Sequence, residues 1–291
     1  MLCSVVKADK NIFSVYQTIY SDADTNLSFD WEKRLSDTTW TNECYWVTQN
    51  EQKVGGLLIL ENTVKFPFLI TPFCDRSLFW RVVLRYIKEN NLTVANLSSL
   101  TDKDVQVLLT FGYKIDMSRR MMCRPTEKYL LELGNQYETQ IPDIKNDVDE
   151  MVAVVLSGYK DGIDYQLDGA CTEEEARNDI LYFFDGYLQT KTLEQSVLIR
   201  EKSTKKLVAF IMSGRHPEEN RERFSLIADI TVLPEHRGKG IAEYMIKHAL
   251  AKAVDTSDVL TLCVTVGNNA ESLYRKLGFW GGPRFTTMSL R

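Results

Sequence analysis

Short apolar runs and amphipathic segments alternate along the whole 291-residue chain. Runs of alternating or continuous apolar residues predict strands, whereas apolar residues spaced three or four positions apart predict helices. The first half is predicted to contain, in chain order, a strand over Leu2–Val6, helices over Asn11–Tyr20 and Phe29–Leu35, strands over Tyr45–Gln49, Val54–Leu60 and Val64–Ile70, a helix over Asp75–Glu89, a strand over Thr93–Leu97, a helix over Asp102–Thr110 and a strand over Met117–Cys123.

The second half repeats this alternation, which favours an α/β or α+β fold with a mixed sheet. Its predicted elements are helices over Asp147–Leu156 and Glu173–Phe184, strands over Ser196–Arg200, Leu207–Ser213 and Phe224–Val232, a helix over Gly238–Ala253, a strand over Val259–Val264, a helix over Asn269–Leu277 and a strand over Phe285–Leu290. The charged run Glu218–Arg223 and the segment Ser157–Cys171 are predicted to be loops.

The two halves also share short sequence features. Thr71-Pro72 parallels Leu233-Pro234 before each long helix, and "TFGYK" around Gly112 parallels "KLGFW" around Gly278. The two offsets, 234 − 72 = 162 and 278 − 112 = 166, differ by no more than one loop insertion explains. We interpret this as a tandem duplication, with domains 1–125 and 126–291, over chance similarity of two α/β halves.

Charge and composition exclude some classes of function. The net charge of −5 argues against broad nucleic-acid binding, which needs a basic face, and most of the acidic excess follows Pro125. The six cysteines show no pairing or CxxC spacing, so we expect neither disulfides nor a metal site and treat the thiols as core residues. The sequence contains neither a signal peptide nor a membrane-spanning run, so we expect a cytoplasmic protein.

Two glycines stand where the predicted helix over Gly238–Ala253 begins. Gly238 and Gly240 would each cost about 1 kcal/mol relative to alanine inside a helix. A helix start, however, presents unpaired N–H groups and a partial positive charge, and glycine lets an anion approach them. Arg237 and Lys239 add positive charge, so the turn is predicted to bind a pyrophosphate. The spacing matches neither a P-loop nor a GxGxxG motif, since Lys239 precedes Gly240 and position 243 is Glu243.

The segment "VLPEHRGKGIA" resembles the Gln/Arg-x-x-Gly-x-Gly/Ala motif of the GNAT superfamily of acyl-CoA-dependent N-acetyltransferases, with Arg237, Gly240 and Ala242 at its defining positions. "NNAESLYRKLGF", residues 268–279, is similar to that family's downstream segment. The resemblance covers the core of residues 196–291. It implies two GNAT-like domains, each with a mixed, mainly antiparallel twisted sheet flanked by helices.

The resemblance also implies how acetyl-CoA binds. The backbone of Ile230, Thr231 and Val232 would hydrogen-bond the pantetheine arm, and the amides from Gly238 through Lys239, Gly240 and Ile241 to Ala242 would hold the pyrophosphate. The strands Phe224–Val232 and Val259–Val264 would part to admit the thioester. The family's usual asparagine position is Gly267 here. Asn268, our choice, or Asn269 would take over that role, or would simply cap the next helix.

Tyr274 matches the position of the family's general acid, where a phenol with a pKa near 10 can protonate the leaving thiolate. The alternative is a ring that only packs on the sheet. Asp229 is the one carboxylate within its predicted strand, and burying it unpaired would be costly. It is either the base, directly or through water, or the partner of a nearby cation. His236 and His248 are predicted to lie at the surface.

The first half lacks these features when the two halves are aligned on their prolines. Arg76, Leu78 and Trp80 then replace Gly238, Gly240 and Ala242, and Leu108 replaces Tyr274. We therefore predict a degenerate first domain in which side chains fill the space that a pyrophosphate needs. It would support the second domain or form part of its acceptor pocket.

The sequence thus predicts an acetyl-CoA-dependent N-acetyltransferase acting by direct attack of a primary amine. The expected partner is a small-molecule or peptide amine, a homodimer is one open assembly, and neither nucleic acid nor membrane is expected. Two other functions remain open: a non-catalytic acyl-CoA-responsive or partner-binding module, and a transferase for longer acyl or aminoacyl groups. Asp161, Asp164 and Asp168 would attract a cationic amine or merely be solvated, and we favour the second interpretation.

Overall fold

The computed structural model describes residues 2–21, 35, 43–160, 162–168, 171–217 and 223–290. The chain divides into two compact units, Met1–Met121 with Gly282–Arg291, and Met122–Gly281. The division at 121/122 is near the expected boundary, but the C-terminal segment, expected in the second domain, belongs to the first unit. The physical reason is pairing, because the last strand forms an antiparallel ladder with a strand of the first unit.

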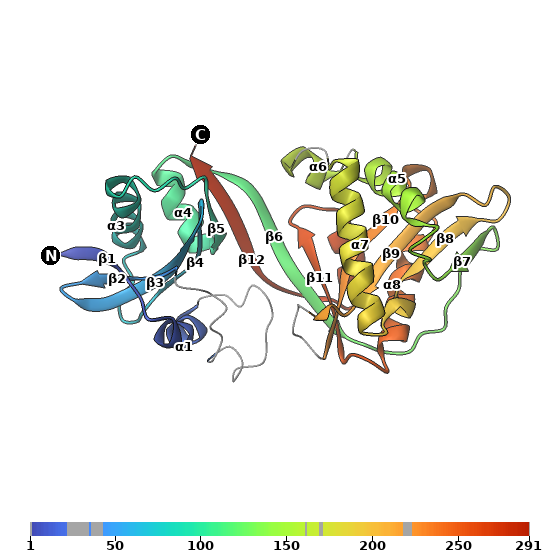
Figure 1. The fold of residues 1–291 in the computed structure, drawn as a ribbon, viewed down its shortest axis with the longest axis horizontal. Coiled ribbons are helices and arrows are strands. Elements are labelled where there is room, and N and C mark those ends of the chain that lie inside the picture. Colours follow the sequence, from blue (N-terminus) through green and yellow to red (C-terminus); the bar gives the residue numbers. More distant parts are fainter. Residues whose placement is uncertain are drawn as a thin grey trace. The chain divides into compact units, whose positions relative to one another are not determined.

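The first unit is a mixed sheet with helices on both faces (Figure 1). Its strand order is β1-β2-β3-β4-β5-β12-β6, and β4 pairs with β5 in parallel. The elements are β1 (Cys3–Lys7), α1 (Lys10–Tyr20), β2 (Cys44–Gln49), β3 (Gln52–Leu60), β4 (Thr63–Leu69), α3 (Arg76–Glu89), β5 (Asn96–Leu100), α4 (Asp102–Thr110), β6 (Tyr113–Pro125) and β12 (Trp280–Leu290).

Two hydrophobic cores stabilise the first unit, one on each face of its sheet. The larger core joins α3 and α4 to the sheet and includes Trp80, Leu108 and the fully buried Met288 of β12. The smaller core packs Phe13 of α1 on the opposite face, against Trp46 and neighbouring residues. Met288 thus makes the C-terminal strand part of this unit's core. Burying a side chain of this size contributes roughly 1.5–3 kcal/mol to the stability of the fold.

The second unit has the strand order β6-β11-β10-β9-β8-β7, with the end of β6 as its edge (Figure 1). The β10–β11 pair is parallel, and the β10–β9, β9–β8 and β8–β7 pairs are antiparallel. The elements are β7 (Tyr137–Gln140), α5 (Val148–Tyr159), α6 (Ile163–Asp168), α7 (Glu173–Gln189), β8 (Val197–Glu201), β9 (Leu207–Gly214), β10 (Phe224–Val232), α8 (Ile241–Ala253), β11 (Val259–Thr265) and α9 (Ala270–Lys276), with short 3₁₀ turns at Leu193–Gln195 and Pro234–His236.

Alternation along its strands divides the second unit's core between the two faces of the sheet. On β9, Ala209 and Ile211 pack against α8, while Phe210 and Met212 pack against α5 and α7. This follows from the period of two in a strand. The predicted fold class is therefore confirmed: each unit is a mixed, mainly antiparallel sheet flanked by helices.

A β-bulge interrupts β10 between Ile227 and Asp229, where the register with β9 shifts. Ile227 belongs to the α8 face, yet both Ala228 and Asp229 lie toward the α5 face: Ala228 packs in that core and Asp229 accepts a hydrogen bond from α5. A bulge re-aims side chains in this way. The parallel pairing with β11 also ends at Ile227–Leu262, so β10 from Asp229 to Val232 has no paired strand on that side.

Several predicted elements differ from the structure. The helix predicted over 238–253 begins at Ile241, the segment 157–171 contains α6, and β7 was not predicted. The strand predicted over 93–97 lies at Asn96–Leu100. The predicted helix 29–35, except Leu35, and the predicted loop 218–223, except Arg223, lie outside the described residues.

All six cysteines lie in the described part, and none forms a disulfide. Cys44 and Cys123 are buried, but Cys74, Cys171 and Cys263 are exposed, so the expectation that the thiols are core residues is wrong for these three. None of the described helices is long and apolar enough to cross a bilayer.

Candidate active site

The glycine turn lies just before α8 rather than inside its first turn. Gly238 and Gly240 have φ values of +73° and +77°, in the left-handed region that glycine adopts without steric cost. Gly240 is the N-cap of α8, and no side chain caps the helix there. The glycines therefore do not weaken the helix. They permit the chain reversal that leads into it.

Space and unpaired amides make this turn a candidate anion site. A Cβ placed on Gly238 or Gly240 would meet nothing within 4 Å. Among the described residues, the N–H groups of Gly238, Gly240 and Ala242 have no hydrogen-bond acceptor. The Ile241 side chain is buried in the core, so the backbone at this point is held firmly. Helix N-termini of this kind bind phosphate groups. The turn therefore fits the pyrophosphate of coenzyme A.

Ion pairs and hydrogen bonds orient the charged side chains of this turn. Arg237 donates to the carbonyl oxygens of Val232 at 3.1 Å and Gly158 at 2.6 Å, so it fixes the turn against β10 and the last turn of α5. Glu243, in the first turn of α8, pairs with Lys247 at 2.8 Å and Lys276 at 2.9 Å, and these contacts lower its pKa. The one acidic side chain of that turn is thus neutralised by lysines, and a bound anion would not meet its full charge.

Asp229 stands at the bulge, where β10 and β11 have ceased to pair. Its Oδ1 accepts hydrogen bonds from the Thr231 hydroxyl at 2.8 Å and the Tyr159 hydroxyl at 3.2 Å. No described residue donates to Oδ2, and no described cation pairs with Asp229, so the predicted ion-pair alternative is not what the structure shows. Burial, the largest cause, raises the pKa of Asp229 to about 6, against the two hydrogen bonds that lower it.

Tyr274 lies on the face of the sheet opposite to Asp229. It lies on α9, is 6% exposed, and packs in the α8 core beside Phe279. No described residue hydrogen-bonds its hydroxyl. Burial first, and then the negative charges of Asp229 and Asp164, raise the pKa of Tyr274 well above its usual value.

Asn268 is engaged by the protein at both ends of its side chain. Its Oδ1 accepts the Ala270 N–H at 2.9 Å at the start of α9, and its amide donates to Asp164 Oδ2 at 3.3 Å. The Thr265 hydroxyl donates to the other oxygen of Asp164. Helix capping, the second of the two roles considered for Asn268, is therefore present. A contact with the cofactor remains a prediction for Asn268 and for Asn269.

The two histidines have structural contacts. His248 is 6% exposed, and its Nε2 lies 3.0 Å from the carbonyl oxygen of Glu194. The prediction that His248 lies at the surface is wrong, because α8 turns it inward, where burial lowers its pKa. His236 is half-buried, with its Nδ1 3.0 Å from the Tyr137 hydroxyl.

Two residues of this region were not predicted from the sequence. Tyr159 ends α5 and reaches Asp229 only because the helix packs closely on β10, where a Cβ on Gly158 would come within 2.3 Å of the Thr231 methyl carbon. Arg124, at the end of β6, donates to the Leu277 carbonyl oxygen and so holds the C-terminal end of α9. Neither residue lies in a motif, so no sequence signal marks it.

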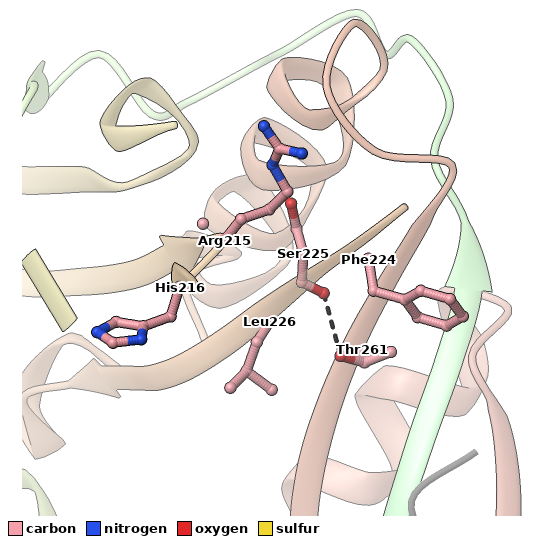
Figure 2. Close-up of a pocket in the computed structure, with 7 residues that line it drawn as sticks. Arg215, His216, Phe224, Ser225, Leu226 and Thr261 are labelled. Atoms are coloured by element: carbon pink, nitrogen blue, oxygen red, sulfur yellow. Dashed lines mark hydrogen bonds between the residues drawn. The ribbon is translucent and has the colours of Figure 1, made fainter. Parts of the chain in front are cut away.

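A separate hollow opens at the other end of β10 (Figure 2). It is lined by the end of β9, the start of β10 and Thr261, whose hydroxyl donates to the Ser225 carbonyl oxygen at 3.0 Å. Its volume of about 10 Å³ holds one water molecule at most. The hollow lies away from Asp229 and the glycine turn along the strand, and we assign it no function.

The second unit resembles known proteins in its sequence. Residues 165–279 match the model of the acetyltransferase (GNAT) family. L-2,4-diaminobutyric acid acetyltransferase from Vibrio cholerae is 34% identical over 89 residues, which cover 31% of this chain and 49% of that protein. The chain thus spans about half the length of this curated relative.

Solved structures resemble the chain over nearly its full length. A GCN5-related N-acetyltransferase from Sphaerobacter thermophilus has a TM-score of 0.68 at 13% identity, with 99% of this chain and 96% of that chain covered. A tandem GNAT protein from the clavulanic acid biosynthesis pathway has a TM-score of 0.54 at 10% identity, with 100% and 99% covered. At such identities the likeness concerns the fold, while the family match concerns the second unit's sequence. Residues 165–279 of the second unit therefore match the GNAT acetyltransferase family in sequence, and the chain shares its fold with solved GNAT proteins, one of which is described as a tandem GNAT protein.

Proposed function

We propose that the second unit transfers an acetyl group from acetyl-CoA to a primary amine by direct attack. The observation that carries this proposal is the open glycine turn before α8, which follows the part of β10 where Asp229 lies beyond the last residue paired with β11. Acetyl-CoA supplies the acetyl group, activated as a thioester. The amides of Gly238 to Ala242, with Lys239 beside them, would hold the pyrophosphate, and the unpaired edge from Ile230 to Val232 would receive the pantetheine arm.

Asp229 is suited to act as the base. A carboxylate with a pKa of about 6 is ionised at neutral pH, yet it holds a proton more readily than an ordinary aspartate. Its Oδ2, to which no described residue donates, accepts the proton of the incoming amine. Thr231 and Tyr159 hold Oδ1 and so fix the direction of Oδ2.

Tyr274 holds a proton on its hydroxyl oxygen for the leaving thiolate. The charge of Asp229 is one cause of the raised Tyr274 pKa, so protonation of Asp229 removes part of that cause. Transfer of the amine proton to Asp229 therefore makes Tyr274 a stronger acid at the moment when the leaving group needs a proton.

We infer that the first unit does not bind acetyl-CoA. Its equivalent helix, α3, is capped by Asp75, whose carboxylate accepts the Leu78 N–H at 2.8 Å. A carboxylate already occupies the anion position at that helix start, and its charge would repel a pyrophosphate.

The test is release of free thiol from acetyl-CoA by the full chain, with a panel of amines that begins with 2,4-diaminobutyrate, the compound in the printed name of the Vibrio relative. We expect release that depends on the amine and falls at least 100-fold in Asp229→Asn. Binding of acetyl-CoA without thiol release for any amine would instead favour a non-catalytic module. Faster release of free thiol from longer acyl-CoA donors than from acetyl-CoA would favour a transferase for longer acyl groups.

A further inference from the structure

The glycine turn before α8 carries two basic side chains, Arg237 and Lys239, and their contacts differ. In the described part of the chain, the Lys239 ammonium has no hydrogen-bond or ion-pair partner. Arg237 instead turns back onto the protein. Its Nε donates to the carbonyl oxygen of Val232 at 3.1 Å, and its Nη2 donates to that of Gly158 at 2.6 Å. One guanidinium therefore joins the end of β10 to a helix 79 positions earlier in the chain.

The Gly158 carbonyl lies in the last turn of α5, which ends at Tyr159. The last carbonyl groups of a helix have no partner within the helix and carry a partial negative charge. A guanidinium is a favourable donor at such a place, because its positive charge strengthens the hydrogen bond. Arg237 thus fixes the C-terminal end of α5.

Apolar packing fixes α5 mainly before this last turn. The buried apolar side chains of the helix all precede residue 156: Val148, Met151, Val152, Val154 and Val155. The first turn of α5 is also fixed by an ion pair of 2.6 Å between Asp149 and Arg177. The last turn therefore depends on polar contacts more than the rest of the helix does.

The same last turn of α5 holds the candidate base. Its backbone packs directly on β10, because a Cβ on Gly158 would come within 2.3 Å of the Thr231 methyl carbon. The next residue, Tyr159, donates its hydroxyl hydrogen to Asp229 Oδ1 at 3.2 Å. Gly158 and Tyr159 are adjacent, so a shift of this turn moves both. The position of the Tyr159 hydroxyl relative to Asp229 thus depends on the hydrogen bond that Arg237 makes.

We propose that Arg237 is a positioning residue for the base. By joining the last turn of α5 to the end of β10, it keeps the Tyr159 hydroxyl on Asp229 Oδ1 and leaves Oδ2 directed to the incoming amine. This inference rests on the proposed acetyl transfer. Arg237 then serves the acceptor side of the reaction, while its neighbour Lys239 serves the pyrophosphate.

The experiment compares three variants of the full chain: Arg237→Met, which keeps the length of the side chain and removes every donor, Tyr159→Phe, and the double variant. The first measurement is the pKa of Asp229 by carboxyl carbon NMR without ligands, with the signal assigned by its absence in Asp229→Asn. The second is the pH dependence of kcat/KM for thiol release from acetyl-CoA with the most reactive amine of the panel. The third is the Kd of acetyl-CoA by calorimetry.

The hydrogen bond from Tyr159 lowers the pKa of Asp229, so its loss should raise that pKa above the value of about 6. We expect Arg237→Met and Tyr159→Phe each to raise it by about 0.5–1 pH unit. The acidic limb of the kcat/KM profile should move up by the same amount, because the base must be ionised. The Kd of acetyl-CoA should change less than about threefold, since neither side chain is proposed to bind the cofactor.

The double variant decides whether Arg237 acts through Tyr159. Arg237→Met should not raise the pKa of Asp229 further once Tyr159→Phe is present, because both changes remove the same hydrogen bond. A direct effect of the Arg237 charge would persist in that background. The other groups that act on this pKa are the same in every variant: Thr231 on β10, Asp164 on α6 and Asp179 on α7.

Two further variants are matched to Arg237→Met. Arg177→Met removes the same kind of side chain from the ion pair at the opposite end of α5, and it should leave the Asp229 pKa and the kcat/KM profile as in the parent. Lys239→Met should raise the Kd of acetyl-CoA severalfold without moving the acidic limb.

The thermal transition shows whether each variant folds. Arg237 is exposed, so Arg237→Met should keep the fold. If it does not, Arg237→Gln, which retains one donor group, replaces it and should give smaller shifts in the same direction.

The outcomes separate the two proposals. An unchanged Asp229 pKa in Arg237→Met, or a shift of equal size when Tyr159→Phe is present, would overturn the positioning role. A Kd for acetyl-CoA that rises as in Lys239→Met, with no change in the Asp229 pKa, would make Arg237 a pyrophosphate ligand instead. A pKa shift that requires Tyr159, in a chain that releases no thiol with any amine, would overturn the proposed function and leave the action of Arg237 on Asp229 intact.

Discussion

The two units contain the same central helices and strands, but they differ in the residues at the start of the long helix, where the second unit is proposed to bind acetyl-CoA. Each has a long helix after a strand whose pairing register shifts: α3 follows β4 in the first unit, and α8 follows β10 in the second. The cap of α3 is Asp75, whose carboxylate takes up an N–H of the first turn, whereas the cap of α8 is Gly240, with no side chain. One helix start is closed by its own chain and the other is left open.

The same contrast holds at the parted strands. The last parallel pair is Val64–Leu97 in the first unit and Ile227–Leu262 in the second. Two residues further along stand Phe66 and Asp229. Tyr274 on α9 corresponds to Leu108 on α4, which is fully buried. The first unit therefore has apolar side chains where the second has an ionisable carboxyl and phenol, which is the difference expected between a structural copy and a chemical one.

The structure also changes the reason for proposing that the first unit does not bind acetyl-CoA. Alignment on the prolines put Trp80 in the space of a pyrophosphate, but Trp80 is fully buried in the core, where its indole N–H donates to Asp104 at 3.0 Å. Aligned on the helix starts, Arg76 and Ile241, the residue opposite Gly240 is Asp75. A negative cap, rather than bulk, is what distinguishes the first unit.

Removal of the Tyr274 hydroxyl is expected to have the largest effect on activity. It makes this position of the second unit apolar, like Leu108 in the first unit. Tyr274→Phe should lower kcat about 1,000-fold, since general acids contribute roughly 10²–10⁴-fold, and leave the Kd for acetyl-CoA nearly unchanged. Steady-state kinetics and calorimetry measure the two values. Tyr86→Phe on α3 of the first unit is the control. Equal activity of Tyr274→Phe and the parent would remove the acid role.

Met288 tests how far the first unit depends on the C-terminal strand. Met288→Ala removes a fully buried side chain from its larger core and should destabilise that unit by about 3 kcal/mol. Amide hydrogen exchange in β5 and α3 reports the loss. Leu290→Ala, at a 63% exposed position of the same strand, should change exchange little. Equal effects of the two substitutions would show that packing of β12 does not matter.

Gly240→Asp copies the cap of the first unit into the second. We expect the Kd for acetyl-CoA to rise about 30-fold, through the carboxylate's repulsion of the pyrophosphate at the helix start. Gly240→Asn separates charge from backbone strain, because asparagine has the same shape and also tolerates positive φ. Calorimetry should therefore find a smaller loss for Asn. A Kd equal to that of the parent in both variants would refute binding at this turn.

Asp229 should make the stability of the second unit depend on pH, an effect absent at the apolar Phe66. Its folded pKa of about 6 lies above the ordinary 3.8, so the native state favours the protonated form. Stability is then highest below about pH 4 and is lost as the pH rises through 6. Asp229→Asn should therefore stabilise the protein at pH 7.5 by about 1–2 kcal/mol and hardly at pH 4. Denaturant unfolding at both pH values tests this, and a gain of the same size at pH 4 would contradict it.

The local sequence pattern was enough to predict most helices and strands and the glycine motif at Arg237–Ala242. The periodicity of residues 224–232 and 102–110 predicted β10 and α4 with their bounds, because each has one clear period and a clear end. The start of α8 was misplaced, since positive φ at Gly238 and Gly240 leaves no trace in hydrophobic periodicity. The short helix α6 was missed because six residues are too few for a periodic signal.

The sequence by itself determined the alternating α/β fold, the repeat, the glycine turn and the choice of Asp229 and Tyr274 as candidates, because these depend on residues close together in the chain. Only the tertiary structure decided which groups meet. The bulge at Ile227–Asp229 turned Asp229 toward Tyr159, 70 positions earlier, α6 brought Asp164 to Thr265, and pairing with β5 took the last strand into the first unit. Such contacts depend on strand register and helix packing between distant segments, which no local pattern encodes.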